Sequence, residues 1–391
     1  MKLSRIFKDF FASERAGGLV LAICTVLSLL IANSNWSEAY SHFWHHKLDL
    51  SFAFIDLNLS VEQWINDGLM TIFFLMVGLE IERELYAGEL KEPRNALLPI
   101  VAALGGMAVP AAIHYFFNQG TSFEKGFGIP MATDIAFAIG MLSLAGNRVP
   151  PAVKIFLTAL AIIDDLGAIL VIAIFYSAGI QLLYLGIALF IGVFLFILNK
   201  KRVTPLYFYL IPGIVMWYCM LRSGIHPTIA GVVLAFLIPF SSEDESTPSY
   251  KLQHFLHNPV AFLILPIFAL ANTGIKLNAN WFTQLQTSNS IGIISGLVVG
   301  KTIGILLFSW IVVKAGWSRL PESTGWRHMT GVAMLGGIGF TMSIFISNLA
   351  FDEFRIIEES KLAVLTGSFI ACLFGLFVFK TSKKQDFLIE E

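Results

Sequence analysis

The sequence predicts an all-α, polytopic membrane protein, and two properties of its 391 residues support this fold class. Hydrophobic residues make up 56% of the chain and charged residues only 14%, whereas about a quarter of a soluble domain is charged. The apolar residues also form runs of roughly 17 to 27 residues, which can cross about 30 Å of hydrocarbon as helices. The net charge of −1 gives no reason to expect a nucleic acid partner.

Twelve apolar segments are expected to span the lipid bilayer. Polar stretches or stretches containing glycine and proline separate them, and most of these connections are short. The segments cover residues 16–33, 62–82, 95–118, 124–145, 151–177, 181–199, 205–221, 224–240, 258–276, 290–313, 326–350 and 359–380. The prediction is therefore a single integral membrane domain over residues 1–391.

The longest connection, residues 34–61, is predicted to contain a small β-hairpin at the membrane surface. Apolar and polar residues alternate over residues 47–54, and a turn separates this run from residues 55–59. An interfacial coil is an equally good interpretation of the same pattern.

The distribution of basic residues predicts the orientation of the chain. Most of its 26 lysines and arginines lie in the N-terminal tail and in the connections on the same side of the membrane. Since cytoplasmic loops carry the excess of positive charge, both termini are expected in the cytoplasm.

Two adjacent carboxylates, Asp164 and Asp165, are the most informative residues of the chain. They lie in the middle of the apolar run 151–177, with no neighbouring cation in the sequence. A carboxylate at mid-bilayer depth costs about 2.5–3.5 kcal/mol on insertion scales, so it is rarely kept without a function. Such a position indicates an ion or proton site with a partner elsewhere in the chain.

Two further ionisable residues are predicted at the same depth. Asp134 lies near the middle of segment 124–145, and Lys301 lies near the middle of segment 290–313. A static ion pair between Lys301 and one aspartate would explain one buried carboxylate, but it would leave the others unexplained. Mutual pairing or a water-filled cavity has to offset their combined insertion cost.

The fourth and eleventh segments are predicted to be interrupted helices that cross. Residues 126–130 (GFGIP) and 336–339 (GGIG) weaken the helical hydrogen-bond ladder. Interrupted helices at matching positions of two halves point to a transport site, so segments 3–5 and 10–12 are predicted to be inverted repeats. Where the helix ends meet, Asp134 would compensate the positive ends and Lys301 the negative ends.

Four motifs of this chain resemble those of the NhaA sodium/proton antiporters of bacterial inner membranes. They are residues 73–80 (FFLMVGLE), 132–138 (ATDIAFA), 161–168 (AIIDDLGA) and 337–346 (GIGFTMSIFI). The resemblance extends from about residue 10 to residue 380. NhaA is itself one of the transporters in which interrupted helices and inverted repeats are recognised.

The resemblance implies roles for five residues of the buried charged group. Asp164 and Asp165 would bind the ion and carry the protons, and Thr133 would supply a further ligand for Na⁺ or Li⁺. Asp134 and Lys301 would compensate charge.

The resemblance also implies a set of residues that respond to pH. They are Glu80, Arg83, Glu84, His226, His254 and His257. The chain departs from the family pattern at Gln253, where an acidic residue is expected. This departure puts the transfer of the family's pH profile in question.

The expected function is electrogenic antiport of cytoplasmic Na⁺ or Li⁺ against external H⁺, by alternating access. Hard cations prefer carboxylate, carbonyl and water oxygens, so protons and Na⁺ would compete for Asp164 and Asp165. Two carboxylates facing one monovalent ion indicate more protons than sodium ions per cycle. No resident cofactor is expected, and the surface hairpin resembles the family's contact in a homodimer.

Two other classes remain open at this point. A sodium-coupled solute symporter would also use Na⁺ and interrupted helices, but it should carry more polar side chains for an organic substrate. An intramembrane aspartyl protease would place two facing carboxylates on different helices, which adjacent Asp164 and Asp165 do not provide. Protease activity that survives Asp165→Asn would favour the second alternative.

Overall fold

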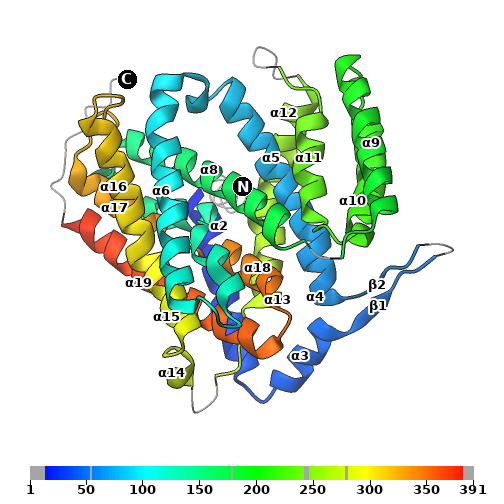
Figure 1. The fold of residues 1–391 in the computed structure, drawn as a ribbon, viewed down its shortest axis with the longest axis horizontal. Helices are drawn as coiled ribbons and strands as arrows, with labels where there is room; N and C mark the ends of the chain where they lie inside the picture. The colour runs from blue at the N-terminus through cyan, green and yellow to red at the C-terminus, as the bar shows by residue number, and fades with distance from the viewer. Residues whose placement is uncertain (1–13, 53–54, 178, 242–245, 278–280, 382–391) are drawn as a thin grey trace, which may run out of the picture. The chain divides into compact units, whose positions relative to one another are not determined.

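The computed structural model describes residues 14–52, 55–177, 179–241, 246–277 and 281–381. Figure 1 shows that this part of the chain is mostly helical. It divides into two compact units, of which unit 1 takes residues 1–20, 89–168 and 277–391 and unit 2 takes residues 21–88 and 169–276. The two chain ends, for which the charge bias predicts a cytoplasmic location, lie outside the described residues.

Unit 2 contains most of the first third of the chain and a central helical segment. Two helices, α2 (Glu14–Ala32) and α8 (Pro151–Phe175), run from unit 1 into unit 2. The remaining elements are α3 (Ser37–His45), β1 (Lys47–Asp49), β2 (Asn58–Ser60), α4 (Val61–Gln63), η1 (Trp64–Leu69), α5 (Met70–Tyr86), α9 (Leu182–Lys200), α10 (Tyr207–Ser223), α11 (Thr228–Leu237), α12 (Pro248–Pro259), η5 (Val260–Ile264) and α13 (Leu265–Asn272).

Unit 1 contains the segments in which the buried charges were predicted. Its elements are η2 (Glu89–Lys91), α6 (Pro93–Asn118), η3 (Glu124–Met131), α7 (Ile135–Leu144), η4 (Gly146–Arg148), α14 (Trp281–Gln284), α15 (Ser288–Ser295), η6 (Gly296–Gly300), α16 (Lys301–Lys314), α17 (Trp326–Gly336), α18 (Phe340–Ala350) and α19 (Phe354–Lys380). Helix α6 packs against α16 and α15, and α19 packs against α15, α17 and α18.

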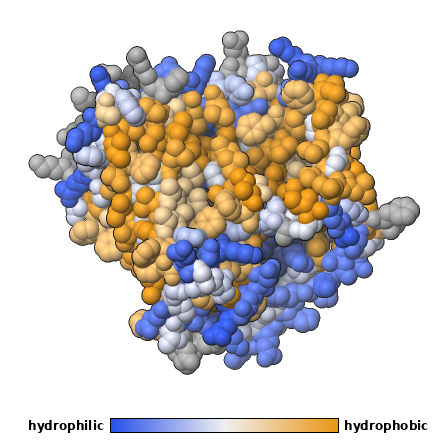
Figure 2. Space-filling model, in the orientation of Figure 1, coloured by the Kyte–Doolittle hydropathy of each residue, from blue (hydrophilic) through white to orange (hydrophobic). Residues whose placement is uncertain are grey.

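Apolar helices long enough to cross a membrane are present in both units. Among the described residues there are seven, or ten if each of three bent helix pairs is one span. Helices α10 and α11, which match segments 205–221 and 224–240, have 17 and 10 residues and are shorter than these. Figure 2 shows hydrophobic residues gathered over α6 and α16, and also over α9 and α10. The chain is therefore a multi-pass membrane protein.

A row of glycines lets the continuous segment of α15, η6 and α16 approach α6 and η3 closely. A Cβ atom added at Gly300 would lie 2.8 Å from Pro110 Cα, and one at Gly296 would lie 2.7 Å from Pro130 Cβ. At Gly304 the added atom would overlap the backbone of Gly105. The row therefore fixes the position of the helix that carries Lys301.

Both predicted interruptions occur in the structure. The first lies between η3 and α7, at residues 132–134, and the second between α17 and α18, at residues 337–339. The two parts of each segment are bent by 42°. The first half of the first segment is a 3₁₀ helix, which has fewer residues per turn than the α-helix expected from the sequence.

Strands β1 and β2 form a two-stranded antiparallel sheet. Lys47 pairs with Ser60, and Asp49 pairs with Asn58. Phe52 and Ile55 form a further bridge toward the turn, and residues 53–54 lie outside the described part of the chain. Ser60 also caps α4, because its hydroxyl accepts a hydrogen bond from the Gln63 backbone N–H.

Candidate ion-binding site

The two helix interruptions of unit 1 lie against each other. The Asp134 backbone N–H donates to the carbonyl oxygen of Ile338 at 2.7 Å. The Ser343 hydroxyl donates to the carbonyl oxygen of Ile129 at 2.6 Å. Backbone groups freed by each interruption are thus satisfied by the other segment, as is required where no water is available.

The carboxylate of Asp134 caps the first turns of two helices. Its Oδ1 accepts a hydrogen bond from the Phe137 N–H of α7 at 2.9 Å, and its Oδ2 accepts one from the Thr341 N–H of α18 at 3.1 Å. The Thr341 hydroxyl donates to the same Oδ2. Since helix N-termini carry partial positive charge, one buried carboxylate compensates both of them.

The ammonium of Lys301 contacts both a carboxylate and a helix C-terminus. Its Nζ lies 2.8 Å from Asp164 Oδ2, and both side chains are fully buried. It also donates to the carbonyl oxygen of Met131, the last residue of η3. A positive charge at this end of a helix is favourable because carbonyl oxygens there carry partial negative charge.

Thr133 lies between Asp164 and the end of α17. Its Oγ1 is 2.8 Å from Asp164 Oδ2 and 2.8 Å from the carbonyl oxygen of Gly336. A hydroxyl carries one hydrogen and both neighbours are acceptors when Asp164 is ionised, so Thr133 can donate to only one of them at a time. Its lone pairs stay available to a cation or to a protonated carboxyl group.

One oxygen of Asp164 remains open to a ligand. Its Oδ2 has Lys301 and Thr133 as neighbours, whereas its Oδ1 is buried and has no hydrogen-bond partner within the described residues. Buried polar atoms are normally paired, so an orphan carboxylate oxygen indicates a place for a cation, a proton or water. The carboxylate of Asp165 is also buried but lies about 100° further around α8.

The structure therefore brings most of the predicted charged residues together. Asp164, Lys301 and Thr133 are in direct contact, and Asp134 lies next to Thr133 at the same interruption. The oxygens available to a hard cation come from a carboxylate, a hydroxyl and backbone carbonyls, which is the donor set that alkali metal ions prefer.

The predicted pH-response residues lie elsewhere, in unit 2. On α5 the Arg83 guanidinium lies 3.2 Å from Glu84 and 3.9 Å from Glu80. On the neighbouring α12, His254 and His257 are exposed, and His254 stacks on Tyr250.

His226 makes a contact of a different kind. It lies between α10 and α11, and its Nε2 is 3.0 Å from the carbonyl oxygen of Tyr176. Another acid of α5, Glu82, is buried and accepts a hydrogen bond from the Ser249 hydroxyl of α12 at 3.3 Å. The structure therefore groups Glu80, Arg83 and Glu84 on α5, whereas the contact of His226 is with the Tyr176 carbonyl.

Three groups of this site were not expected from the sequence. Two are the backbone carbonyls of Met131 and Gly336. The third is Thr341, whose hydroxyl donates to the same carboxylate of Asp134 that caps α7. Thr341 lies directly after an interruption, at a helix start, and this position is the sequence signal that points to it. The carbonyls carry no such signal, because every residue has one.

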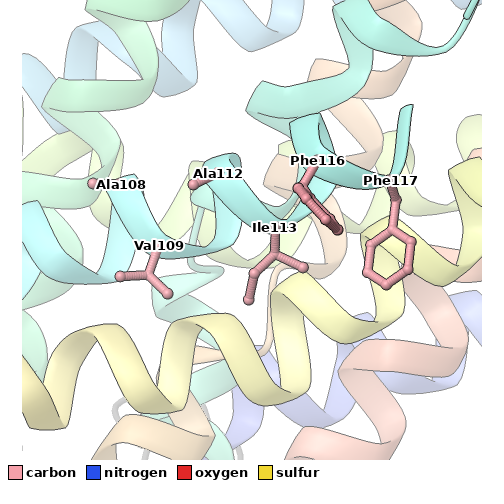
Figure 3. Close-up of a pocket in the computed structure, with 6 residues that line it drawn as sticks. All are labelled: Ala108, Val109, Ala112, Ile113, Phe116 and Phe117. Atoms are coloured by element: carbon pink, nitrogen blue, oxygen red, sulfur yellow. The ribbon is translucent and has the colours of Figure 1, made fainter. Parts of the chain in front are cut away.

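An apolar surface groove lies on α6. Figure 3 shows its six side chains projecting from this helix. They are Ala108, Val109, Ala112, Ile113, Phe116 and Phe117. These side chains are all apolar, so the groove offers no side-chain ligand to a cation.

Comparison with known proteins decides the family. The sequence model of the family described as Na⁺/H⁺ antiporter 1 matches residues 8–379. The chain belongs to this family. The match includes both interruptions, Asp164, Asp165 and Lys301, so it covers the whole of the site described above.

Several curated members of the family are similar over their full length. The Na⁺/H⁺ antiporter NhaA of Cytophaga hutchinsonii is 56% identical over 385 residues, which are 98% of this chain and 97% of that protein. The Na⁺/H⁺ antiporter NhaA 1 of Flavobacterium johnsoniae is 57% identical over 375 residues, or 96% of each chain.

A solved structure shares the fold at much lower identity. The sodium proton antiporter of Methanocaldococcus jannaschii is 14% identical, with a TM-score of 0.52 over 97% of both chains. At this identity the similarity concerns the fold alone.

Proposed function

We propose that this chain exchanges cytoplasmic Na⁺ or Li⁺ for external H⁺ by alternating access, with both ions competing for Asp164 and Asp165. As a secondary transporter of the Na⁺/H⁺ antiporter family it is not an enzyme. The observation that carries the site assignment is the fully buried carboxylate of Asp164, whose Oδ1 has no hydrogen-bond partner in the described residues.

The arrangement around Asp164 suggests how competition arises. In the unloaded state Lys301 neutralises the carboxylate, and its ammonium also holds the Met131 carbonyl. A Na⁺ that binds to Asp164 takes over this neutralising role and repels the ammonium. A proton on Asp164 removes the negative charge that attracts Na⁺, so the two substrates exclude each other.

Asp165 completes the exchange in this proposal. Its carboxylate is buried one position along α8, so the pair titrates as a coupled unit. If both residues release a proton for each Na⁺ that binds, two positive charges are exchanged for one, and each cycle moves net charge across the membrane. The exchange is therefore electrogenic, and an inward proton gradient would drive Na⁺ out.

Unit 2 supplies the pH response in this proposal. Glu80, Arg83 and Glu84 form one charged cluster on α5, and His254 and His257 lie on the helix packed against it. His226 is the remaining titratable residue of the set. Since Gln253 is neutral, the response would depend on fewer acids of α12 than the family pattern has.

The architecture that accompanies this function is a proposal as well. We infer twelve spans, inverted repeats over segments 3–5 and 10–12, and two units that work as one transporter over residues 1–391. The sheet of β1 and β2 would lie at the membrane surface and contact a second copy in a homodimer. We place the chain in a bacterial inner membrane with both termini in the cytoplasm, and assign it no resident cofactor.

Proteoliposomes with an imposed pH gradient test the function. Added Na⁺ or Li⁺ should collapse the gradient with the native protein and fail to do so with Asp164→Asn. The matched control is Asp352→Asn, which changes an exposed acid of the same unit and should exchange normally. Equal activity with K⁺ would contradict the selectivity, and normal exchange by Asp164→Asn would contradict the site.

A further inference from the structure

A second buried polar cluster lies in unit 1, outside the ion-binding site. It joins the end of α6 to the starts of α15 and α19. Its members are His114, Asn118, Thr287, Asn289, Glu359 and Ser360. All but Thr287 are buried, and His114 is fully enclosed. The ring of a histidine titrates close to neutral pH in its ordinary state, so the groups that face His114 decide whether it can hold a proton here.

The hydrogen bonds of the cluster fix which ring nitrogen of His114 carries hydrogen. Nε2 of His114 lies 3.2 Å from Oδ1 of Asn289, whose amide nitrogen donates to Ser360 at 2.9 Å. An amide oxygen only accepts, so Nε2 must be the donor. Nδ1 is then a bare acceptor, and it has no hydrogen-bond partner in the described part of the chain.

Asn118 does not supply the missing donor. Its amide nitrogen donates to the carbonyl oxygens of His114 and Ser288, at 2.9 and 3.2 Å, and this uses both of its hydrogens. The same nitrogen lies 3.5 Å from His114 Nε2, and this longer contact then has no hydrogen left to share. Its own Oδ1 is buried and, within the described residues, unpaired. The cluster therefore holds two orphan acceptors, His114 Nδ1 and Asn118 Oδ1, one helical turn apart on α6.

Two glycines lie close to the ring of His114. A Cβ atom added at Gly126 would lie 3.0 Å from ring atom Cε1, and one at Gly292 would lie 3.0 Å from Cδ2. The backbone of η3 and that of α15 thus approach the imidazole closely, and any larger residue at either place would displace it. Packing therefore fixes the plane of the ring, and the hydrogen bond between Nε2 and Asn289 Oδ1 selects the orientation that leaves Nδ1 unpaired.

A negative charge lies at the other end of the same network. Glu359 Oε1 accepts a hydrogen bond from the Thr287 hydroxyl and lies 3.5 Å from the Asn289 amide nitrogen. Asn289 thus connects the imidazole to a carboxylate. The charged residues of η3, α16 and α19, the elements around His114, are Glu124, Lys125, Lys301, Lys314, Arg355, Glu358, Glu359, Lys361 and Lys380. Glu359 is the one that shares Asn289 with His114.

We propose that Nδ1 of His114 is a second proton-binding site, with Glu359 as its counter-charge, and that its occupation weakens Na⁺ binding at Asp164. In the binding step a hydronium O–H bond breaks and the N–H bond forms on the Nδ1 lone pair, which leaves imidazolium and water. Asn118 is the last residue of α6, next to the exposed Gln119 and Gly120. In the proposed orientation this end faces outside.

The same helix links the two sites. α6 also carries Gly106, where an added Cβ atom would lie 3.8 Å from Cε of Lys301. His114 is eight positions further on, or about 12 Å along the helix. A positive charge on His114 inside the membrane is little screened by salt, so in this proposal it repels a cation at Asp164. Proton binding at His114 is independent of the proposed function, whereas the effect of this proton on exchange rests on that function.

Solid-state NMR of the ¹⁵N-histidine-labelled protein in lipid bilayers tests the proton site. The His114 signal, identified by its loss in His114→Gln, should show Nε2–H and bare Nδ1 at pH 9 and gain a proton on Nδ1 upon acidification. Glu359→Gln should move this titration to lower pH by at least half a unit. An Nδ1–H ring at pH 9, or no second protonation down to pH 5, would overturn the proposal.

His328→Gln is the matched control for this measurement. His328 is another buried histidine of unit 1, and its Nδ1 already accepts a hydrogen bond from the Gly325 N–H at 3.3 Å. Its replacement should leave the His114 signal and its titration unchanged.

Transport measurements test the effect on exchange. The pH inside the vesicles is held fixed while the outer solution is acidified. The resulting rise in the KM for outer Na⁺ should be at least three times larger for the native protein than for His114→Gln. If that variant does not assemble, Glu359→Gln carries the test and should require a lower outer pH for the same rise. Superimposable profiles would refute the coupling, whereas loss of exchange in the native protein would refute the proposed function instead.

Discussion

Asp134 and Thr341 join the two helix interruptions through one carboxylate oxygen. Oδ2 of Asp134 accepts hydrogen bonds from both the backbone N–H and the hydroxyl of Thr341, while Oδ1 caps α7 through Phe137. One buried negative charge therefore serves two helix N-termini. This explains why a carboxylate beside Thr133 is kept at a depth where its insertion is costly.

Asp134→Asn should destabilise the protein. An asparagine keeps one acceptor oxygen, but its NH₂ group cannot accept from a helix N–H, so one of the two caps is lost together with the charge. We expect a loss of about 1–2 kcal/mol in unfolding free energy, measured by denaturation in detergent. Asp352→Asn, on an exposed acid, should change it little, and equal stability of the two variants would contradict the capping role.

Lys301→Met should be strongly destabilising because it leaves the Asp164 carboxylate buried without its cation. Removal of one partner from a buried ion pair costs about 3–5 kcal/mol. Adding Asp164→Asn to the same chain should recover part of this loss, which a double-mutant cycle measures. Lys314→Met, at the exposed end of the same helix, is the control. Additive effects of the two buried substitutions would exclude the pairing.

Thr133→Val and Thr133→Ser should separate the hydroxyl from the shape of the side chain. Valine matches threonine in shape but provides no oxygen, whereas serine keeps the hydroxyl that contacts Asp164 and Gly336. We expect Thr133→Val to weaken Li⁺ binding about tenfold, as for a lost hydrogen bond to a charged group. Thr133→Ser should remain within a factor of about three in calorimetry. Equal loss in both variants would assign the effect to packing.

Gly304→Ala should impair folding, since the added methyl group would overlap the backbone of Gly105 on α6. The same change at Gly192, in the middle of α9, meets no atom within 4 Å. That control should be neutral or stabilise by about 0.5–1 kcal/mol, because alanine is the better helix former. Thermal unfolding compares the two, and a tolerated Gly304→Ala would contradict the close packing of α6 and α16.

The apparent affinity for Na⁺ should fall with decreasing pH if protons and Na⁺ share Asp164 and Asp165. Each proton that must leave before Na⁺ binds gives about a tenfold rise in apparent Kd per pH unit below the titration range. Two coupled protons would therefore give up to about a hundredfold rise. Calorimetry with Li⁺ across pH 6–9 measures the slope, and a pH-independent Kd would exclude competition.

The sequence determined the membrane class and the location of the charges. Long apolar runs force helices in lipid, because backbone groups there have no water as a partner. Adjacent Asp164 and Asp165 in the middle of such a run, with Asp134 and Lys301 at matching depth, indicated one buried site before any contact was known. Glycine and proline also predicted both interruptions, since they weaken the helical ladder wherever they occur.

Only the tertiary structure decided which groups meet. It brought Lys301 into contact with Asp164 and the Met131 carbonyl. It also placed the Asp134 carboxylate within hydrogen-bond distance of Thr341, and Thr133 between Asp164 and Gly336. It also revealed the cluster of His114, whose partner Asn289 is 175 positions away in the sequence. Depth and helical period are local properties of a sequence. The angular placement of one helix against another depends on packing between distant segments, such as the glycine row of α15 and α16 against α6.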